Sequence, residues 1–121
     1  MRRAKQDDLA EINAWLEARK LKQLEPAALP KFGVIEPGVM AGFLVDTDCN
    51  VVMLDHFVSN PAIPRRSVSN AVDQAVLCLC IAAKNKGKRV LVISKRRSIL
   101  RRAARWGFAS RGVWGRMAME A

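Results

Sequence analysis

One stretch of the sequence, residues 51–71, combines residue types that could bind a phosphate group. It begins with an eight-residue, largely apolar run whose β-branched and aromatic members predict a buried strand. Pro61 and Pro64 then interrupt regular structure, and Arg-Arg-Ser-Val-Ser-Asn-Ala at 65–71 forms a small, basic turn that opens a long apolar helix. The backbone N–H groups of such a turn and the positive end of the helix dipole converge on one point. We therefore expect a phosphate-binding corner at residues 65–71.

The charge distribution favours an anionic partner. The 121-residue chain has a formal net charge of +10, and its second half, residues 61–121, holds fourteen basic and two acidic side chains. A positive field concentrated in one half of a chain attracts polyanions. The partners that this charge allows are a phosphorylated cofactor, nucleic acid, an acidic protein or a lipid surface.

The sequence predicts no metal site, disulfide framework or membrane span. Its three cysteines include no C-x-x-C pair, so we expect no metal ligands, and we expect buried thiols in a reducing cytosol. No run of about 18 uninterrupted apolar residues is present. The N-terminal segment turns acidic at Asp7 and Asp8, where a signal peptide would become apolar. We therefore expect a cytoplasmic protein that does not enter a membrane.

The spacing of apolar residues and turn signals predicts a single α/β domain over residues 1–121, a layered sandwich of sheet and helices. Three consecutive strands between residues 32 and 59 should form an antiparallel meander, and a strand at 88–93 should run parallel to the one at 51–59 because a helix connects them. The expected order is β-α-β-β-β-α-β-α-β. Its strands lie at 2–5, 32–36, 39–45, 51–59, 88–93 and, as a last strand or hairpin, within 108–119; its helices run from Asp7 or Asp8 to about 20–24, from about 68 to 87, and from 99 to about 106.

This order resembles the GNAT N-acetyltransferase fold, a mixed β-sheet flanked by helices, over nearly the whole chain. Residues 34–44 look like the second and third strands of the family and their hairpin, residues 63–72 lie over its acyl-CoA signature Q/R-x-x-G-x-G/A, and residues 98–108 resemble its late helix ending in Gly-Phe. The resemblance implies a GNAT-like, acyl-CoA-binding domain with acetyl-CoA as cosubstrate. The chain also looks like small GNAT-like proteins encoded in phage genomes, which would place it in the host cytoplasm.

Two departures from the family pattern bear on activity. In the signature, Pro64 stands where Gln or Arg is usual, and Ser67 and Ser69 replace the two glycines. Serine keeps the backbone N–H donors but lacks the conformational freedom of glycine. Many family members carry a tyrosine that protonates the departing CoA thiolate; the corresponding residue here is Ala103, and the chain contains no tyrosine. Protonation would then fall to water or to another group such as Ser98.

The resemblance also implies which residues would hold the CoA thioester. The pantetheine arm would pair with the backbone of the central strand at Phe57, Val58 and Ser59, where one N–H would polarise the thioester carbonyl. Arg101, together with Lys95 and Arg97, is a candidate for the outer phosphates. The pyrophosphate would rest on the start of the following helix, at Arg65, Arg66, Ser67, Val68, Ser69, Asn70 and Ala71.

Two residues of the central strand could take the proton from an attacking amine, and they are Asp55 and His56. His56 is the only histidine of the chain, and the reference pKa of histidine, about 6.5, suits a base at neutral pH. Neighbours on a strand point to opposite faces, so at most one of the two can look into the cleft. Two structural interpretations stay open: a histidine hydrogen-bonded within the sheet and an Asp–Arg pair.

Three functions are compatible with these residues. The first is an N-acetyltransferase in which an unidentified amine, for which an acidic substrate would fit the charge, attacks acetyl-CoA directly in a ternary complex. The second is a GNAT-like protein without catalysis, serving as a binding or structural, virion-associated module. The third is a nucleic-acid binder that uses phosphate contacts alone, since no reader motif is present. A last apolar strand containing Trp114 and Met117 could pair across a homodimer.

Overall fold

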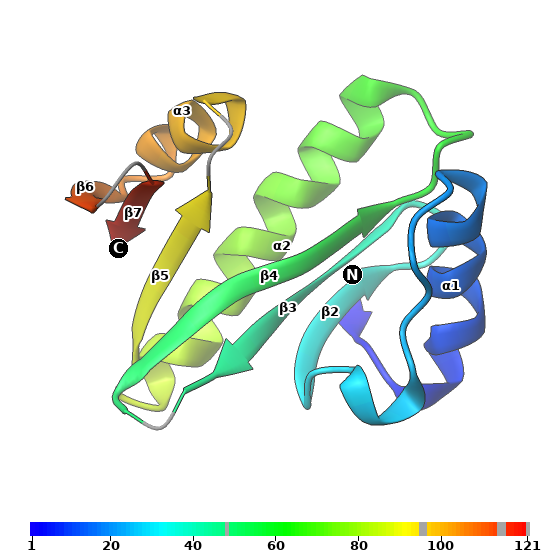
Figure 1. Ribbon diagram of the computed structural model, residues 1–121, viewed down its shortest axis with the longest axis horizontal. Coiled ribbons are helices and arrows are strands. Elements are labelled where there is room, and N and C mark those ends of the chain that lie inside the picture. Colours follow the sequence, from blue (N-terminus) through cyan, green and yellow to red (C-terminus); the bar gives the residue numbers. More distant parts are fainter. Residues whose placement is uncertain (48, 95–96, 114–115, 121) are drawn as a thin grey trace.

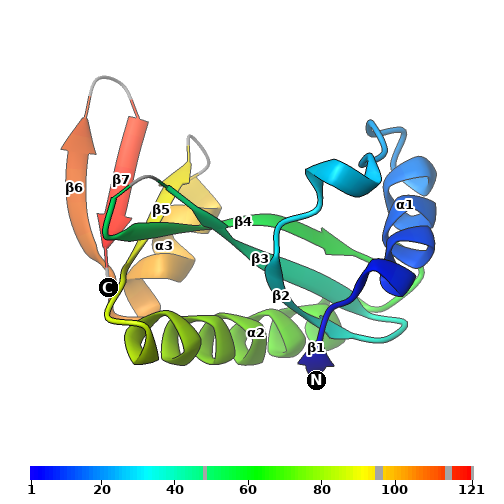
Figure 2. The same ribbon diagram turned by 90° about the horizontal axis from the view of Figure 1, so that it is seen from below.

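The structure, a computed structural model, describes residues 1–47, 49–94, 97–113 and 116–120. Within these residues, seven strands form one mixed sheet in the order β1-β2-β3-β4-β5-β7-β6. Helices cover both of its faces (Figures 1 and 2). The expected α/β fold, a mixed sheet flanked by helices, is confirmed.

The strands lie where the sequence predicted them, and the last one is a hairpin. They are β1 (Arg2–Arg3), β2 (Phe32–Glu36), β3 (Met40–Asp46), β4 (Val51–Ser59), β5 (Arg89–Ser94), β6 (Ala109–Val113) and β7 (Arg116–Glu120). Strands β1 to β4 pair antiparallel in sequence order, and β5 lies parallel to β4, as expected. Because β7 lies between β5 and β6, it offers no edge for pairing across a homodimer. Trp114, named for that interface, lies outside the described residues.

The helices are α1 (Leu9–Ala18), α2 (Arg65–Asn85) and α3 (Arg97–Arg105), with two short 3-10 turns, η1 (Gln6–Asp8) and η2 (Pro26–Ala28). Helix α1 ends before the predicted 20–24 because Lys20 adopts φ 57° and the Leu21 N–H donates to the Leu16 carbonyl at 2.9 Å, a Schellman ending. Helix α2 begins at Arg65, one turn before the predicted start near residue 68.

Asp8 is the N-cap residue of α1, but its carboxylate does not cap that helix and instead closes the capping box of η1. It accepts hydrogen bonds from the Lys5 N–H at 2.8 Å and from two guanidinium nitrogens of Arg2 at 2.7 and 2.9 Å. The hydrogen bonds from Arg2 lower the pKa of the buried Asp8 carboxyl below its ordinary value. The pair fixes the first strand against the start of α1.

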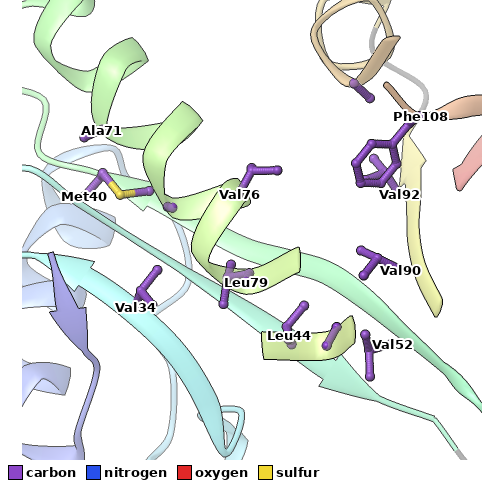
Figure 3. Packing of buried hydrophobic residues seen from close by; sticks show 13 residues of the cluster. Val34, Met40, Leu44, Val52, Ala71, Val76, Leu79, Val90, Val92 and Phe108 are labelled. Atoms are coloured by element: carbon purple, nitrogen blue, oxygen red, sulfur yellow. The ribbon is translucent and has the colours of Figure 1, made fainter. Parts of the chain in front are cut away.

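Two apolar clusters hold the helices to the sheet. On one face, α2 and α3 pack on a cluster that includes Met40, Leu44, Val52 and Leu79 (Figure 3). On the other face, α1 packs Ile12, Trp15 and Leu16 against β2, β3 and β4. Figure 2 shows α1 and α2 on opposite sides of the sheet. The side chains of one strand therefore alternate between the α1 face and the α2 face.

The expectation of buried thiols is wrong for two of the three cysteines. Cys49 and Cys78 are exposed, and Cys80 is half-buried, which raises the pKa of its thiol. Cys78 is exposed because it lies on the side of α2 turned away from the sheet. Among the described residues, no helix is long and apolar enough to cross a membrane.

Candidate functional site

Strands β4 and β5 start as a parallel pair and then separate (Figure 1). Residues 51–53 of β4 pair with residues 89–91 of β5, and the register of the described residues contains no later pair. Past this point, the edge of β4 that would face β5 lacks ladder partners, so its backbone N–H and C=O groups can bind an added extended chain.

A cavity of about 300 Å³ lies where the two strands have separated. Its walls come from β4, α2, β5 and α3, and most of them are apolar. The lining residues are Leu54, Asp55, Phe57, Val72, Val92, Ile99, Arg102 and Trp106. A largely apolar cavity with few polar groups is the usual form of a small-molecule site.

A β-bulge shapes the β4 side of this cavity. The pairing of β3 with β4 shifts register opposite Gly42, where β4 carries one extra residue, and His56 has φ 53° at this point. Consequently Leu54 and Phe57, three residues apart, both pack on the α2 side of the sheet. A Cβ on Gly42 would lie 2.8 Å from two carbons of the Phe57 ring. The ring can lie across β3 at this point because glycine has no side chain.

Asp55 and His56 differ in their relation to the cavity. Asp55 is exposed and lines the cavity, whereas the half-buried His56 is not among the lining residues. The Asp55 carboxylate accepts a hydrogen bond from the backbone N–H of His56 at 2.7 Å. Asp55 forms no ion pair within the described part of the chain, so the alternative of a structural Asp–Arg pair finds no support there.

The start of α2 differs from the loop that we expected. Pro64 is the N-cap, and the Val68 N–H already donates to the Pro64 carbonyl at 3.2 Å. The N–H groups of Val68, Ser69 and Asn70 are therefore used within the helix, and those of residues 65–67 are the ones without intrahelical partners. This narrows the predicted set of anion-binding donors to the first turn.

Arg65 and Arg66 make this first turn an unusual helix start. Both are exposed, and the turn contains no acidic residue, so two cations lie at the positive end of the α2 dipole. That placement is unfavourable for the isolated helix and becomes favourable when an anion binds.

The side chains of three other predicted cofactor-binding residues make contacts within the protein. Val58 is buried in the cluster on the α1 face, and Ala71 is buried in the cluster on the α2 face. The Ser59 hydroxyl accepts a hydrogen bond from Arg19 at 2.8 Å. Because the side chains of Val58 and Ala71 are buried, only the backbone of these two residues could meet a ligand. Lys95 lies outside the described residues.

Sequence reasoning missed a contact that fixes the wall formed by α3. The Asp73 carboxylate on α2 accepts hydrogen bonds from Trp106 Nε1 at 2.9 Å and from the Arg102 guanidinium at 3.1 Å, and the same guanidinium donates to the Ser69 carbonyl. Arg102 Nε is buried without a hydrogen-bond partner, and its guanidinium lies 5.6 Å from the centre of the Trp106 ring. The signal in the sequence was Asp73, an isolated acid in a strongly basic half.

Arg101 does not line this cavity. Together with Ser98 and Arg105 it lines a separate hollow on α3. The described residues contain no cluster of three or more acidic, histidine or cysteine side chains that could hold a metal ion. The candidate site is therefore an apolar cavity with one carboxylate, an unpaired stretch of β4 backbone and a basic helix start.

Comparison with known proteins supports the fold assignment. No protein-family model matches the sequence, and no curated protein matches it. The structure is similar to the crystal structure of a proposed acyl-CoA N-acyltransferase from Klebsiella pneumoniae subsp. pneumoniae MGH 78578, with a TM-score of 0.57 and 16% sequence identity. The similarity covers 93% of this chain and 84% of that one. At this identity it shows a shared fold.

Proposed function

We propose that the chain is an acyl-CoA-binding domain that transfers the acetyl group of acetyl-CoA to an amine. The observation that carries the proposal is the separation of β4 from β5 beside a cavity of about 300 Å³. The pantetheine arm of CoA contains amide groups, which can hydrogen-bond to the unpaired backbone of β4 as an added strand would. The similar fold of the Klebsiella protein agrees with this function.

The phosphates of CoA would bind at the start of α2. The N–H groups of residues 65–67 point out of the helix end, and Arg65 and Arg66 supply two positive charges beside them. The Ser67 hydroxyl adds a further donor. Val68, Ser69 and Asn70 complete the first turns without giving their own N–H groups.

The chemistry would be a direct transfer. The amine nitrogen attacks the thioester carbon, a backbone N–H of residues 57–59 stabilises the developing oxyanion, and the C–S bond then breaks. Asp55, which lines the cavity, takes the proton released by the amine. The thiolate leaves and takes a proton from water, because Ala103 is buried at the position where family members carry tyrosine and Ser98 lines the other hollow. His56 acts by holding the bulge rather than as the base.

A second candidate is a domain that binds acetyl-CoA without catalysis. The buried Ala103 and the lack of tyrosine favour it. The two candidates share the binding site and differ in turnover. Saturable binding of acetyl-CoA without release of free CoA, over a panel of small amines and peptides, would identify the second.

Calorimetric titration with acetyl-CoA tests the shared site. Ser67→Glu places a carboxylate in the first turn of α2, where it repels phosphates, and should abolish measurable binding. Gln74→Glu is the matched control, because it adds the same charge at an exposed position further along α2 and should leave the affinity within about twofold of wild type. Equal affinities of the two variants would place the phosphates elsewhere.

A further inference from the structure

Helix α3 carries a second concave surface that the proposed acyl transfer does not use. The α3 hollow, as we call it, is lined by Ser98, Arg101 and Arg105 and has a volume of about 540 Å³. These residues follow a helical spacing of three and four, so they form one stripe along α3. All three are exposed, and none of them lines the cavity beside β4.

The two arginines of the α3 hollow are not neutralised by the part of the chain that is described. Neither Arg101 nor Arg105 makes an ion pair or a side-chain hydrogen bond there. Their neighbour Arg102 differs, since its guanidinium is bound to Asp73 and to the Ser69 carbonyl. One helix thus uses one arginine to pack on α2 and presents two others to solvent.

The half of the chain that contains α3 holds few carboxylates that could pair with the α3 hollow. Residues 61–121 contain fourteen basic side chains and two acidic ones, and Asp73, one of the two, is committed to Arg102 and Trp106. A concave surface with this excess of positive charge concentrates anions from solution. Guanidinium groups also bind phosphate oxygens through paired hydrogen bonds.

The lining chemistry favours a nucleic-acid strand over an acidic peptide. Many peptide-binding surfaces rely on apolar or aromatic anchors that enter pockets, and the described residues that line the α3 hollow include none. A sugar-phosphate backbone needs no such anchor, because phosphate contacts alone support sequence-independent binding. Arg101 and Arg105 are separated by about 6 Å along the helix axis, so both can contact one strand.

We infer that the α3 hollow binds the phosphate backbone of single-stranded nucleic acid, independently of base sequence. Ser98, Arg101 and Arg105 contact phosphates, and no base is read. This inference does not depend on acyl transfer. It predicts binding whose logarithm falls linearly with the logarithm of salt concentration.

Fluorescence anisotropy with a labelled thymidine oligonucleotide of about 20 nucleotides, longer than the usual site of one small domain, tests the inference. Arg101→Gln/Arg105→Gln removes two phosphate contacts. At about 0.7 counterions released per contact, the salt slope should drop by about 1.4, and binding should weaken about 25-fold at 0.1 M salt. Lys20→Gln/Lys22→Gln is the matched control, since it removes the same charge from exposed positions near the end of α1 and should change affinity less than threefold.

Three results would overturn the inference. The first is an equal loss of affinity in both double variants, which would indicate a general effect of net charge. The second is binding of poly-glutamate at the same salt with an affinity equal to that of the oligonucleotide, which would make the partner an acidic peptide. The third is full displacement of the oligonucleotide by acetyl-CoA at concentrations that saturate the calorimetric site, which would make the α3 hollow part of the cofactor site.

Discussion

Replacing Gly42 by alanine tests the geometry of the β4 bulge. A Cβ at this position would stand 2.8 Å from two carbons of the Phe57 ring, where ordinary contacts are 3.4–4 Å. The ring must retreat by about 0.6 Å, and the space available to it is the cavity that it lines. Overpacking of this kind costs about 1–3 kcal/mol. We expect Gly42→Ala to lower the free energy of unfolding by that amount and to weaken acetyl-CoA binding.

Urea denaturation of a double-mutant cycle measures the contact itself. In a Phe57→Leu background the ring is gone, so Gly42→Ala should cost at least about 1 kcal/mol less than it does in the wild type. Calorimetric titration of the same four proteins reports the effect on the cavity. If Gly42→Ala were within about 0.5 kcal/mol of wild type in both backgrounds, the ring would not cross β3 as described.

Three further substitutions address separate parts of the account. Asp73→Ala removes two hydrogen bonds that join α2 to α3 and should lower the free energy of unfolding by about 2 kcal/mol, whereas Asp46→Ala, which removes an exposed pair, should cost less than about 1 kcal/mol in the same urea titration. Asp8→Asn should destabilise the protein by a constant amount well above pH 3.8. Because Arg2 lowers the folded-state pKa of Asp8, this difference in stability from wild type should shrink as the pH falls below that value. A difference in stability that does not vary with pH would contradict this. Asp55→Asn should lower the rate of CoA release with an amine acceptor by about 10²–10⁴-fold with little change in acetyl-CoA affinity, and an unchanged rate would exclude Asp55 as the base.

The sequence predicted the strands well because the local signals agreed with the packing. Turn residues bound the strands: Gly38, Gly87 and Gly107 all adopt positive φ in the structure, which glycine tolerates best. The alternation of apolar residues in between matches two buried faces of one sheet. Local pattern and tertiary environment point to the same structure at these positions.

The bulge could not be predicted, and it turns Phe57 to the same side of the sheet as Leu54. Alternation implied that Asp55 and His56 point in opposite directions, but it could not say which one meets the cavity. The extra residue comes from a register shift against β3, and His56 adopts positive φ without being glycine. Nothing local in the strand encodes that shift.

The spacing of residues in the sequence also could not predict the contact between α2 and α3. Asp73 lies 29 residues from Arg102 and 33 from Trp106, so no helical or strand spacing relates them. The indole N–H of Trp106 donates to the Asp73 carboxylate, since the N–H of a buried or partly buried tryptophan usually finds a hydrogen-bond partner.

Hydrogen–deuterium exchange with and without acetyl-CoA tests the central claim most directly, because it reports where the ligand touches the backbone. We expect acetyl-CoA binding to slow amide exchange at residues 54–59 of β4 and at residues 65–67, whose N–H groups have no hydrogen-bond partner within α2. Exchange in α1 should stay unchanged. Saturable binding that leaves the exchange of both segments unaltered would contradict the account.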